Sequence, residues 1–597
     1  MSRPALASLA LFAAALPANA AAATLSVTDP AGAPLATAMV REVAAAPRKR
    51  DTSDGGYPAP GRPFTIDVDV TRFTDAAGRV RFEDRGRPVR LIVRKPGWRD
   101  ATVEVAAGQA EARIALQPET DAAKRAEALP ANAWLGALDL GDAARKRRFQ
   151  LQCGFCHQQG NAFTRRERSI EEWRALIARM LRYGSRLPSE DQRALPALLA
   201  AGWRALREHP ERLAAPPAWD AALAATTITE WPIGDAMSQP HDPLLGRDGH
   251  VYVADNIQDR LWEVDPATQR VTVHKVPHRA GDEPGGLLAA RLKDFPRHDS
   301  TSNAHSLAQS ARDGHVFITP SAQQRLVEFD PATGQFTLHE IGAGFYPHTI
   351  RIDAQDRVWF TLALSNQVAM FDRATRRFTL HDLPPRSLRE RLTVALIKPI
   401  FRLMSWGVPL ANWLPVDRIS TGVPLPYGID ITPDGTVWAT RLHADDLARI
   451  DPKSGAVTMI PVPFAGPRRL RSDAAGNLWI TAFAESAIYR YEPAARRFTR
   501  FELPVAPAGS ETPYALNVDR RRGIVWVNGN QSDSLYALEI ATGAWRRVPL
   551  PRRVAFTRDI EIAADGTVWT STSSFPSWHV EDGQPTLIRV QSAAPAR

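Results

Sequence analysis

Residues 426–455 read PYGIDITPDGTVWATRLHADDLARIDPKSG, and this stretch shows the unit from which most of the chain is built. A short strand is expected before the turn at Asp434-Gly435, and a second strand, 437–440, after it. The turn at 451–455 then leads into a last strand. Short runs of β-forming residues between Asp, Gly and Pro turns predict antiparallel strands. Four strands in about 40–45 residues are typical of one blade of a β-propeller.

Copies of this unit recur between residues 225 and 597. Their turns lie at Gly249, Gly314, Arg357, Gly435, Gly476, Gly523 and Gly566. The two longest spacings contain insertions near 281–302 and 386–422. We therefore predict a seven-bladed propeller over 225–597, in which 226–232 supplies the strand that closes the last blade. Closure of the circle removes exposed sheet edges.

The repeated pattern Pro-Tyr-Gly-Ile, Asp-Gly-x-Val-Trp-x-Thr and Ile-Asp-Pro-x-x-Gly resembles the virginiamycin B lyase (streptogramin lyase) propeller family. The resemblance covers 225–597. It implies a C–O lyase that opens a cyclic ester by elimination, with a catalytic histidine and magnesium-binding glutamates, some of them just after the Trp-x-Thr strand. At that position the copies carry Asp255, Pro320, Leu362, Arg441, Ala482, Gly529 and Thr572. The absence of glutamate there argues against lyase activity.

One position near the start of each innermost strand carries residues suited to binding. These residues are His241, His305, His348, Tyr427, Arg468, Tyr514 and Arg558. Equivalent positions in successive blades form a ring at one mouth of the central channel. Imidazoles suit copper, iron or zinc, and arginines suit anions. The alternative is a structural ring whose histidines bond to neighbouring backbone carbonyls.

We predict that His241, His305 and His348 in this ring bind a second metal, such as copper or iron. Tyr427 and Tyr514 would add a phenolic ligand or a proton donor. The two arginines would hold an anionic substrate.

A second motif, Cys153-Gly154-Phe155-Cys156-His157, contains the only two cysteines of the 597 residues. C-x-x-C-H is the pattern for covalent attachment of a c-type haem. The two thiols form thioethers with the two vinyl groups of one porphyrin, and the histidine becomes the proximal iron ligand. The motif therefore predicts heme c at Cys153, Cys156 and His157.

Two other kinds of site also use a C-x-x-C pair. A structural zinc site normally needs four ligands, and the chain has no further cysteine to supply them. A thioredoxin-like pair lies in an alternating β/α pattern, whereas the residues after this motif are predicted to be helical. Haem attachment is favoured over both.

The haem motif lies in a segment, 121–222, that is predicted to be helical. Ile170, Trp173, Ile177 and Met180 recur at helical spacing. The pattern Trp173…Met180…Gly184, followed by a final helix, resembles cytochrome c domains fused to exported enzymes. Met180 is the predicted second iron ligand. The alternatives are that Met180 only packs on its helix, that His209 is the ligand, or that the sixth position is open.

Residues 24–118 predict a small β-sandwich of short alternating strands with Gly, Pro and Asp turns. The run 27–32, the turn at 74–78 and Lys95-Pro96-Gly97-Trp98 resemble the immunoglobulin-like carboxypeptidase regulatory-like domains. Such a module is expected to act as a spacer or a docking surface.

The N-terminus and the charge bear on location. Residues 1–20 hold one Arg3, an apolar run and then Ala18-Asn19-Ala20, which predicts a cleaved signal peptide and a periplasmic or secreted protein. The net charge is +9, without a nucleic-acid-binding motif. A basic exterior suits an acidic redox partner or an anionic membrane face; the alternative is an ordinary solubilising surface.

The insertion at 386–422 combines an apolar stripe with basic residues. The stripe consists of Leu388, Leu392, Ala395, Leu396, Pro399, Ile400, Leu403 and Trp406. We expect a lid packed across the propeller. Peripheral membrane contact through 386–406 is the alternative.

Together these features predict a mainly β chain: a propeller, an N-terminal sandwich and an α-helical cytochrome c domain between them. The predicted function is that of an exported electron-transfer haem protein. Its propeller binds, and as an oxidoreductase oxidises, a substrate, or docks a redox partner. The alternatives are a lyase in which the cytochrome is a passenger, and a non-catalytic binding scaffold.

Overall fold

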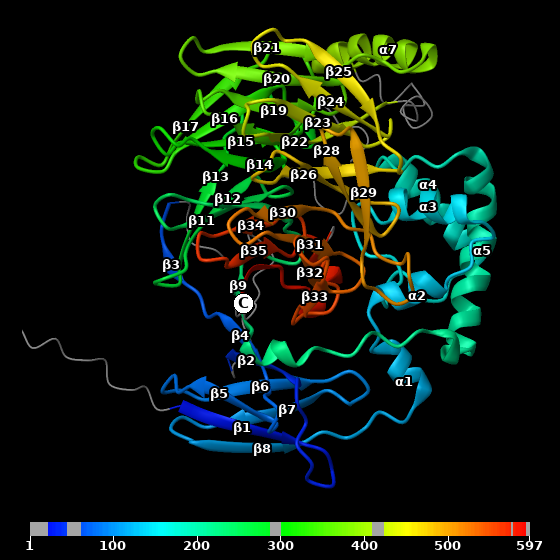
Figure 1. The fold of residues 1–597 in the computed structure, drawn as a ribbon, viewed down its shortest axis with the longest axis vertical. Coiled ribbons are helices and arrows are strands. Elements are labelled where there is room, and N and C mark those ends of the chain that lie inside the picture. Colours follow the sequence, from blue (N-terminus) through cyan, green and yellow to red (C-terminus); the bar gives the residue numbers. More distant parts are fainter. Residues whose placement is uncertain are drawn as a thin grey trace, which may run out of the picture.

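The computed structural model describes residues 22–44, 61–286, 300–406, 408, 423–574 and 577–592. The predicted signal peptide at 1–20 and residues 409–422 of the long insertion lie outside these ranges. The fold is mainly β, as expected, and most of its strands form four-stranded antiparallel sheets stacked around a common centre (Figure 1).

The first half of the propeller segment contains three sheets with strands in chain order. The first consists of β10 (Pro240–Leu245), β11 (Val251–Asp255), β12 (Arg260–Asp265) and β13 (Arg270–Lys275), and the N-terminal strand β3 (Phe64–Thr65) pairs with β13 at its edge. The second consists of β14 (Ala304–Gln309), β15 (Val316–Pro320), β16 (Arg325–Asp330) and β17 (Gln335–Glu340). The third consists of β18 (Pro347–Ile352), β19 (Val358–Leu362), β20 (Gln367–Asp372) and β21 (Arg377–Asp382).

The second half repeats this arrangement. One sheet is formed by β22 (Pro426–Ile431), β23 (Val437–Arg441), β24 (Asp446–Ile450) and β25 (Val457–Pro461). The next is formed by β26 (Pro467–Ser472), β27 (Leu478–Ala482), β28 (Ala487–Glu492) and β29 (Arg497–Glu502). Another is formed by β30 (Leu516–Asp519), β31 (Ile524–Gly529), β32 (Ser534–Glu539) and β33 (Trp545–Pro549).

The innermost strands contact one another in the order β10, β14, β18, β22, β26 and β30, and then β34 (Glu561–Ile562), which contacts β10 again. The sheet of β34 continues through β35 (Val568–Ser571) and β36 (Thr586–Gln591) to β9 (Thr227–Pro232). These four-stranded sheets are consistent with propeller blades, and the circle closes by pairing strands from the two ends of the segment. The count of seven stays a prediction.

Adjacent sheets are held together by apolar side chains that alternate between their two faces. Val316, Ile318 and Phe329 of one sheet, for example, pack against Tyr252 and Leu261 of the sheet before it. All five side chains are buried. Removing such side chains from water is the main favourable term in folding, because it scales with buried apolar area.

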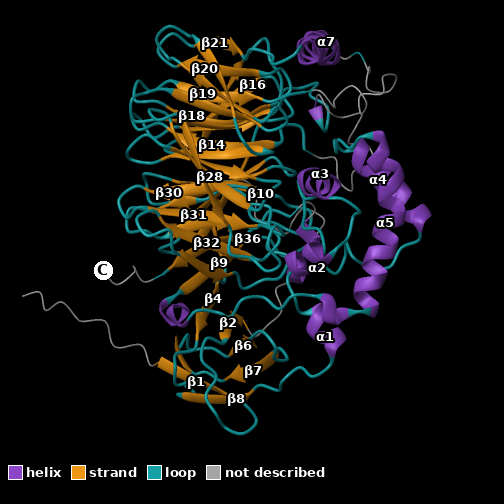
Figure 2. Cartoon of the chain, turned by 45° about the vertical axis from the view of Figure 1, so that its right-hand side comes forward, coloured by secondary structure: helices purple, strands orange, loops and turns teal. Residues whose placement is uncertain are grey.

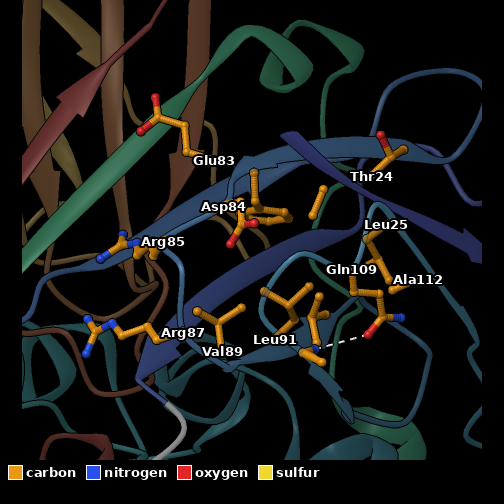
Figure 3. A pocket seen from close by; sticks show the side chains of 14 residues that line it. Thr24, Leu25, Glu83, Asp84, Arg85, Arg87, Val89, Leu91, Gln109 and Ala112 are labelled. Carbon is orange, nitrogen blue, oxygen red and sulfur yellow. Dashed lines mark hydrogen bonds between the residues drawn. The ribbon is translucent and has the colours of Figure 1, made fainter. Parts of the chain in front are cut away.

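Most of the N-terminal strands lie below the propeller in Figure 1, whereas β3 lies beside it and pairs with β13. The N-terminal strands are β1 (Ala22–Thr28), β2 (Met39–Ala44), β3 (Phe64–Thr65), β4 (Asp69–Phe73), β5 (Arg79–Glu83), β6 (Val89–Arg94), β7 (Ala101–Val105) and β8 (Glu111–Ala115). One sheet has the order β5-β1-β8, while β4-β2-β6-β7 continues the sheet of β9 through the pair β4–β9. A small pocket between the sheets is lined mainly by Leu25, Leu91 and their neighbours (Figure 3).

The helical segment lies along one side of the propeller (Figure 2). Its helices are α1 (Ala122–Glu127), α2 (Ala131–Ala137), α3 (Ala143–Cys153), α4 (Ile170–Arg182) and α5 (Ser189–Glu208). Trp134, Phe149, Trp173 and Trp203 form its apolar core. No described helix is long and apolar enough to span a membrane. Whether this segment is a cytochrome c domain, and the N-terminal one a regulatory-like domain, stays a prediction.

The insertion forms α7 (Leu388–Ser405) at the edge of the propeller (Figures 1 and 2). The side chains of Leu388, Leu392 and Leu396 are 70, 55 and 58% exposed, whereas Ile397 is buried. Much of the apolar stripe therefore faces outward, unlike the face of a lid packed on the propeller.

Candidate functional site

The C-x-x-C-H motif begins at the last residue of α3. This helix starts at Asp142, whose carboxylate accepts a hydrogen bond from the backbone N–H of Arg145. A Cβ atom on Gly154 would lie 2.7 Å from the Gln150 carbonyl oxygen, so the turn between the cysteines requires glycine. Neither Cys153 nor Cys156 is in a disulfide. Burial raises the pKa of Cys153 to about 12 and also raises that of Cys156, which keeps both thiols protonated.

His157 is oriented through one ring nitrogen. Its Nδ1 lies 3.2 Å from the Gln158 carbonyl oxygen and 3.2 Å from Nε2 of Gln159. Burial lowers the pKa of His157, which favours the neutral imidazole. When Nδ1–H donates to the carbonyl, Nε2 is left with its lone pair available, as an iron ligand requires. The motif residues therefore fit a covalently attached haem.

The motif is packed against three residues of the predicted ring, Arg558, Arg468 and Tyr427. Arg558 donates hydrogen bonds of 3.3 and 3.4 Å to the carbonyl oxygens of Phe155 and Cys156. The Phe155 ring lies 4.1 Å below the Arg468 guanidinium and 6.0 Å from the Tyr427 ring. The sequence gap between these residues exceeds 250 positions, so only the fold brings them together.

Further contacts hold the helical segment in this position. Gln150 donates to the Gly509 carbonyl oxygen at 2.8 Å, and Gln158 donates to the Asp533 carboxylate at 2.6 Å. Asn132 donates to the Ala506 carbonyl oxygen at 3.0 Å. The C-x-x-C-H motif is therefore docked on the propeller by polar contacts that flank it.

The predicted ring residues do meet in a circle. The ring centroids of His241 and His305 are 3.8 Å apart, those of His305 and His348 are 4.0 Å apart, and those of His348 and Tyr427 are 4.0 Å apart. The hydroxyls of Tyr427 and Tyr514 are 2.6 Å apart. The Tyr514 hydroxyl lies 3.5 Å from Nε2 of His241, which closes the circle.

Asp242 is a site residue that the sequence analysis missed. Its Oδ1 lies 2.8 Å from Nδ1 of His241, and its Oδ2 accepts a hydrogen bond of 2.9 Å from Arg469. Strict alternation along β10 would turn Asp242 away from the channel. A register irregularity between Pro240 and Pro243 allows the successive side chains of His241 and Asp242 both to lie at the site. The same irregularity recurs at the start of β14, β18, β22 and β26. A proline opens β18, β22 and β26, whereas β14 opens with Ala304.

The three ring histidines are neutral at neutral pH. Burial lowers the pKa of His241 to about 4, although the Asp242 carboxylate opposes the shift. Burial holds the pKa values of His305 and His348 well below the usual value; the other ring histidines reinforce the shift at His305, and Arg469 reinforces it at His348. Ligand atoms of His241, Asp242 and His305 lie within 4.8 Å of one another, a spacing at which they can hold a metal ion. His348 is outside this group.

Tyr514 is the ring residue with the most acidic phenol. Its burial raises the pKa, but Arg558, Arg468 and Arg469 outweigh this effect and lower the pKa below its usual value. The guanidinium carbon of Arg468 lies 3.8 Å from the Tyr514 ring centroid, and that of Arg558 lies 4.6 Å from it. The mouth of the channel is therefore rich in positive charge.

Among the described residues, neither Met180 nor His209, the two sequence-predicted candidates for the second iron ligand, forms a hydrogen bond or ring contact with His157. Met180 is half-buried on α4, and His209 lies at the end of α5, exposed and 3.2 Å from a Glu211 carboxylate oxygen. The ring centroid of His579 is instead 5.2 Å from that of His157. Both nitrogens of His579 are buried and unpartnered in the described part of the chain. No repeat or motif marked His579, because it lies in a loop between β35 and β36.

The position after the Trp-x-Thr strand contains no magnesium-site chemistry. Asp255 is its only acid, and the Asp255 carboxylate accepts hydrogen bonds from the backbone N–H groups of Gln239, Ile257 and Gln258. Arg441 pairs with the Asp446 and Glu390 carboxylates. These residues stabilise the local fold.

A family model matches part of the propeller segment. Residues 416–575 match the virginiamycin B lyase family. A streptogramin B lyase structure shares 16% identity at a TM-score of 0.46, covering 62% of this chain and 98% of that chain. The selenomethionine-substituted virginiamycin B lyase from Staphylococcus aureus shares 15% sequence identity at a TM-score of 0.45, and the match covers 62% of this chain and 100% of that chain. The Kuenenia stuttgartiensis hydrazine synthase shares 13% sequence identity at a TM-score of 0.41, and the match covers 60% of this chain and 96% of that chain. No curated protein matches the chain.

The family match bears out the resemblance to virginiamycin B lyase-like propellers. It favours the lyase alternative over the haem hypothesis, because no comparison bears on haem or electron transfer. The structural likenesses are too weak to support a functional argument.

Proposed function

We propose that this protein carries heme c at Cys153, Cys156 and His157 and transfers single electrons between that haem and a substrate or redox partner at the propeller ring. The observation that carries the proposal is the pair of hydrogen bonds from Arg558 to Phe155 and Cys156. They connect the haem motif directly to the ring.

A bound haem would supply the one-electron chemistry. The chain's own residues would hold the haem and influence the relative stability of its oxidised and reduced states. The two cysteines would fix its position, and Gln158 would orient His157 through Nδ1. The buried cations Arg468 and Arg558 beside the motif would favour the more negative, reduced state of the cofactor.

The test begins with the full chain exported under conditions that allow haem attachment. The wild type should keep its haem after denaturation and acid-acetone extraction, and it should show a sharp reduced α-band. Replacing both Cys153 and Cys156 with Ala should remove all covalent haem while the circular dichroism of the β fold is kept. Colour that extracts completely from the wild type would refute the assignment.

The second axial ligand can be identified by spectroscopy. We propose Met180 from the sequence pattern, and the structure adds His579 as a competitor because of its place beside His157. Loss of a methionine-type charge-transfer band in Met180→Leu, with no change in His579→Gln, would identify Met180. A low-spin bis-histidine signal that His579→Gln abolishes would identify His579.

The second metal at His241, His305 and His348 is a separate proposal. The neutral imidazoles and the ligand atoms of His241, His305 and Asp242, which lie within 4.8 Å of one another, support a site at these residues. His348 is in ring contact with His305 but lies outside this group. The test is elemental analysis after reconstitution with copper, iron and zinc. One non-haem metal per chain in the wild type, lost in His305→Ala, supports the site; haem iron alone contradicts it.

The lyase alternative is favoured by the family match over 416–575. It predicts turnover of a cyclic ester that requires Mg²⁺ and is unaffected by the haem redox state. The non-catalytic scaffold predicts no turnover, but electron exchange with a protein partner that weakens as salt rises. Assays of the wild type and the double cysteine variant, each with and without Mg²⁺, separate these readings from an oxidoreductase.

We also propose a periplasmic or secreted location, from the signal-peptide pattern. We further propose that 386–406 contacts a membrane surface through α7, whose leucines are exposed. Binding to anionic vesicles that Leu392→Gln weakens would support it.

A further inference from the structure

Two buried arginines at the channel mouth differ from the others in the described part of the chain. Arg468 is fully buried and Arg558 is 3% exposed. Neither forms an ion pair with a carboxylate among the described residues. The remaining buried arginines all do so: Arg41 with Asp582, Arg165 with Glu127, Arg325 with Asp282, Arg441 with Asp446, Arg469 with Asp242, Arg471 with Asp559 and Arg552 with Asp69.

Arg468 makes few of the hydrogen bonds that a guanidinium can make. Its Nη2 donates to the Tyr427 hydroxyl at 2.9 Å, while Nε and Nη1 are buried and unpartnered. Its guanidinium carbon lies 4.1 Å from the ring centroids of both Phe155 and Phe483. Aromatic rings offset only part of the cost of burying a cation, about 0.5–2 kcal/mol for each contact.

Arg558 bonds only to neutral groups. Besides the carbonyl oxygens of Phe155 and Cys156, it reaches the Ser573 hydroxyl at 3.4 Å. These long bonds can be exchanged for stronger ones, because a guanidinium prefers the two oxygens of a carboxylate or a similar oxyanion. Nδ1 of the buried His305 is also unpartnered.

We propose that the mouth of the channel binds an oxyanion of the carboxylate class, held by Arg468 and Arg558 beneath the Phe155–Cys156 segment. Buried charges in proteins are paired or coordinate a ligand. Here the protein supplies two cations and leaves their countercharge to the ligand. The inference deepens the proposed function by naming the ligand chemistry, but its charge argument stands without the haem.

The carboxylate can come from two sources. One is a haem propionate, which would make the pair part of the cofactor site. The other is a soluble substrate. The two sources differ in whether the site is free when haem is attached, so the haem-bearing chain and the Cys153→Ala/Cys156→Ala chain give separate answers.

The experiment measures the unfolding midpoint of the full chain with sodium benzoate and with sodium chloride at equal ionic strength. Benzoate should raise the midpoint by at least about 2 °C, as expected for a ligand well above its Kd. Arg468→Met and Arg558→Met should each lose most of this rise. Without benzoate, Arg468→Met should unfold at the same temperature as the wild type or higher, because it removes an uncompensated charge.

Arg325→Met is the matched control, since Arg325, the first residue of β16, is buried but pairs with the carboxylates of Asp282 and Glu340. It should lower the midpoint without benzoate and keep the full benzoate effect. A benzoate effect in both the haem-bearing and haem-free chains identifies a soluble carboxylate. An effect only in the haem-free chain identifies a propionate.

The proposal is overturned if benzoate has no effect on either chain, or if Arg468→Met behaves like Arg325→Met. A tyrosinate absorbance at neutral pH that disappears in Tyr514→Phe, with no benzoate effect, would likewise overturn it, because the phenolate would then be the countercharge. If the wild type holds no haem but responds to benzoate, only the haem proposal fails.

Discussion

Histidines gather in two regions of the propeller, at the outer edge of its first two sheets and in the ring at the channel mouth. At the outer edge, the Glu263 carboxylate lies 2.6 Å from both His250 and His274. In the next sheet, Glu328 lies 2.8 Å from His315 and 2.7 Å from His339. Each glutamate joins histidines of neighbouring strands, so both clusters satisfy their own polar groups.

The ring provides much less internal pairing. The Asp242 carboxylate is hydrogen-bonded to His241, but Nδ1 of His305 and Nε and Nη1 of Arg468 are buried without a hydrogen-bond partner among the described residues. Because unsatisfied buried polar groups cost stability, their presence is expected where a ligand completes the site. The comparison separates histidines that brace strands from histidines that are available for binding.

The largest expected effect comes from removing the one carboxylate of the ring. Asp242→Asn should lower the free energy of unfolding by about 3–5 kcal/mol, because it leaves Arg469 with an incomplete buried ion pair. Urea unfolding measures this. Asp382→Asn is the control, since Asp382 is 72% exposed and pairs with Lys398; it should change the free energy by less than about 1 kcal/mol. Equal effects would show that the ring network is not charge-dependent.

A smaller loss is expected at the outer edge. Glu328→Gln should lower the free energy of unfolding by about 1–3 kcal/mol, because it weakens the bonds to His315 and His339 in a half-buried site. Glu263→Gln, the same change in the preceding sheet, should give a similar loss. If either variant leaves the free energy of unfolding unchanged, that cluster does not stabilise its sheet.

The two regions should respond to different pH ranges. Burial lowers the pKa of His241 to about 4, so the unfolded chain binds a proton here before the folded chain does. The contribution of neutral His241 to the free energy of unfolding is therefore complete above about pH 6.5 and is lost as the pH falls toward 4. For Glu328, burial opposes but the bonds from His339 and His315 prevail, lowering the pKa to about 2. Its contribution is complete above about 4.5 and is lost as the pH falls toward 2.

Urea unfolding across pH separates these contributions. His241→Gln should flatten the dependence between about pH 6.5 and 4, and Glu328→Gln should flatten it below about 4.5. The reverse assignment of the two ranges would contradict the burial argument.

The smallest effect is expected at His305. His305→Gln should change the free energy of unfolding by less than about 1 kcal/mol, because Nδ1 has no hydrogen bond to lose. His339→Gln should cost more, about 1–2 kcal/mol, since it loses the bond to Glu328. A costlier loss at His305 would indicate that the ring is a structural feature.

The repeats could be predicted from the sequence because their turns and alternating strands are local features. Ring membership followed from them, since equivalent positions in equivalent strands meet at one channel. Asp242 was missed because alternation assigns it to the opposite face, and only the irregular register of β10 brings it to His241. His579 and the contact between Phe155 and Arg468 depend on how the helical segment docks, which no periodicity encodes.

The pairing of β4 with β9 has a consequence for the behaviour of shortened chains. β9 lies between β36 and β4, so the N-terminal strands cover the outermost strand of the propeller. Deleting them would expose a row of unpaired backbone N–H and C=O groups along β9. Such an edge pairs readily with another chain. An isolated propeller is therefore expected to self-associate, and in the whole protein the N-terminal strands are expected to protect β9 from such pairing.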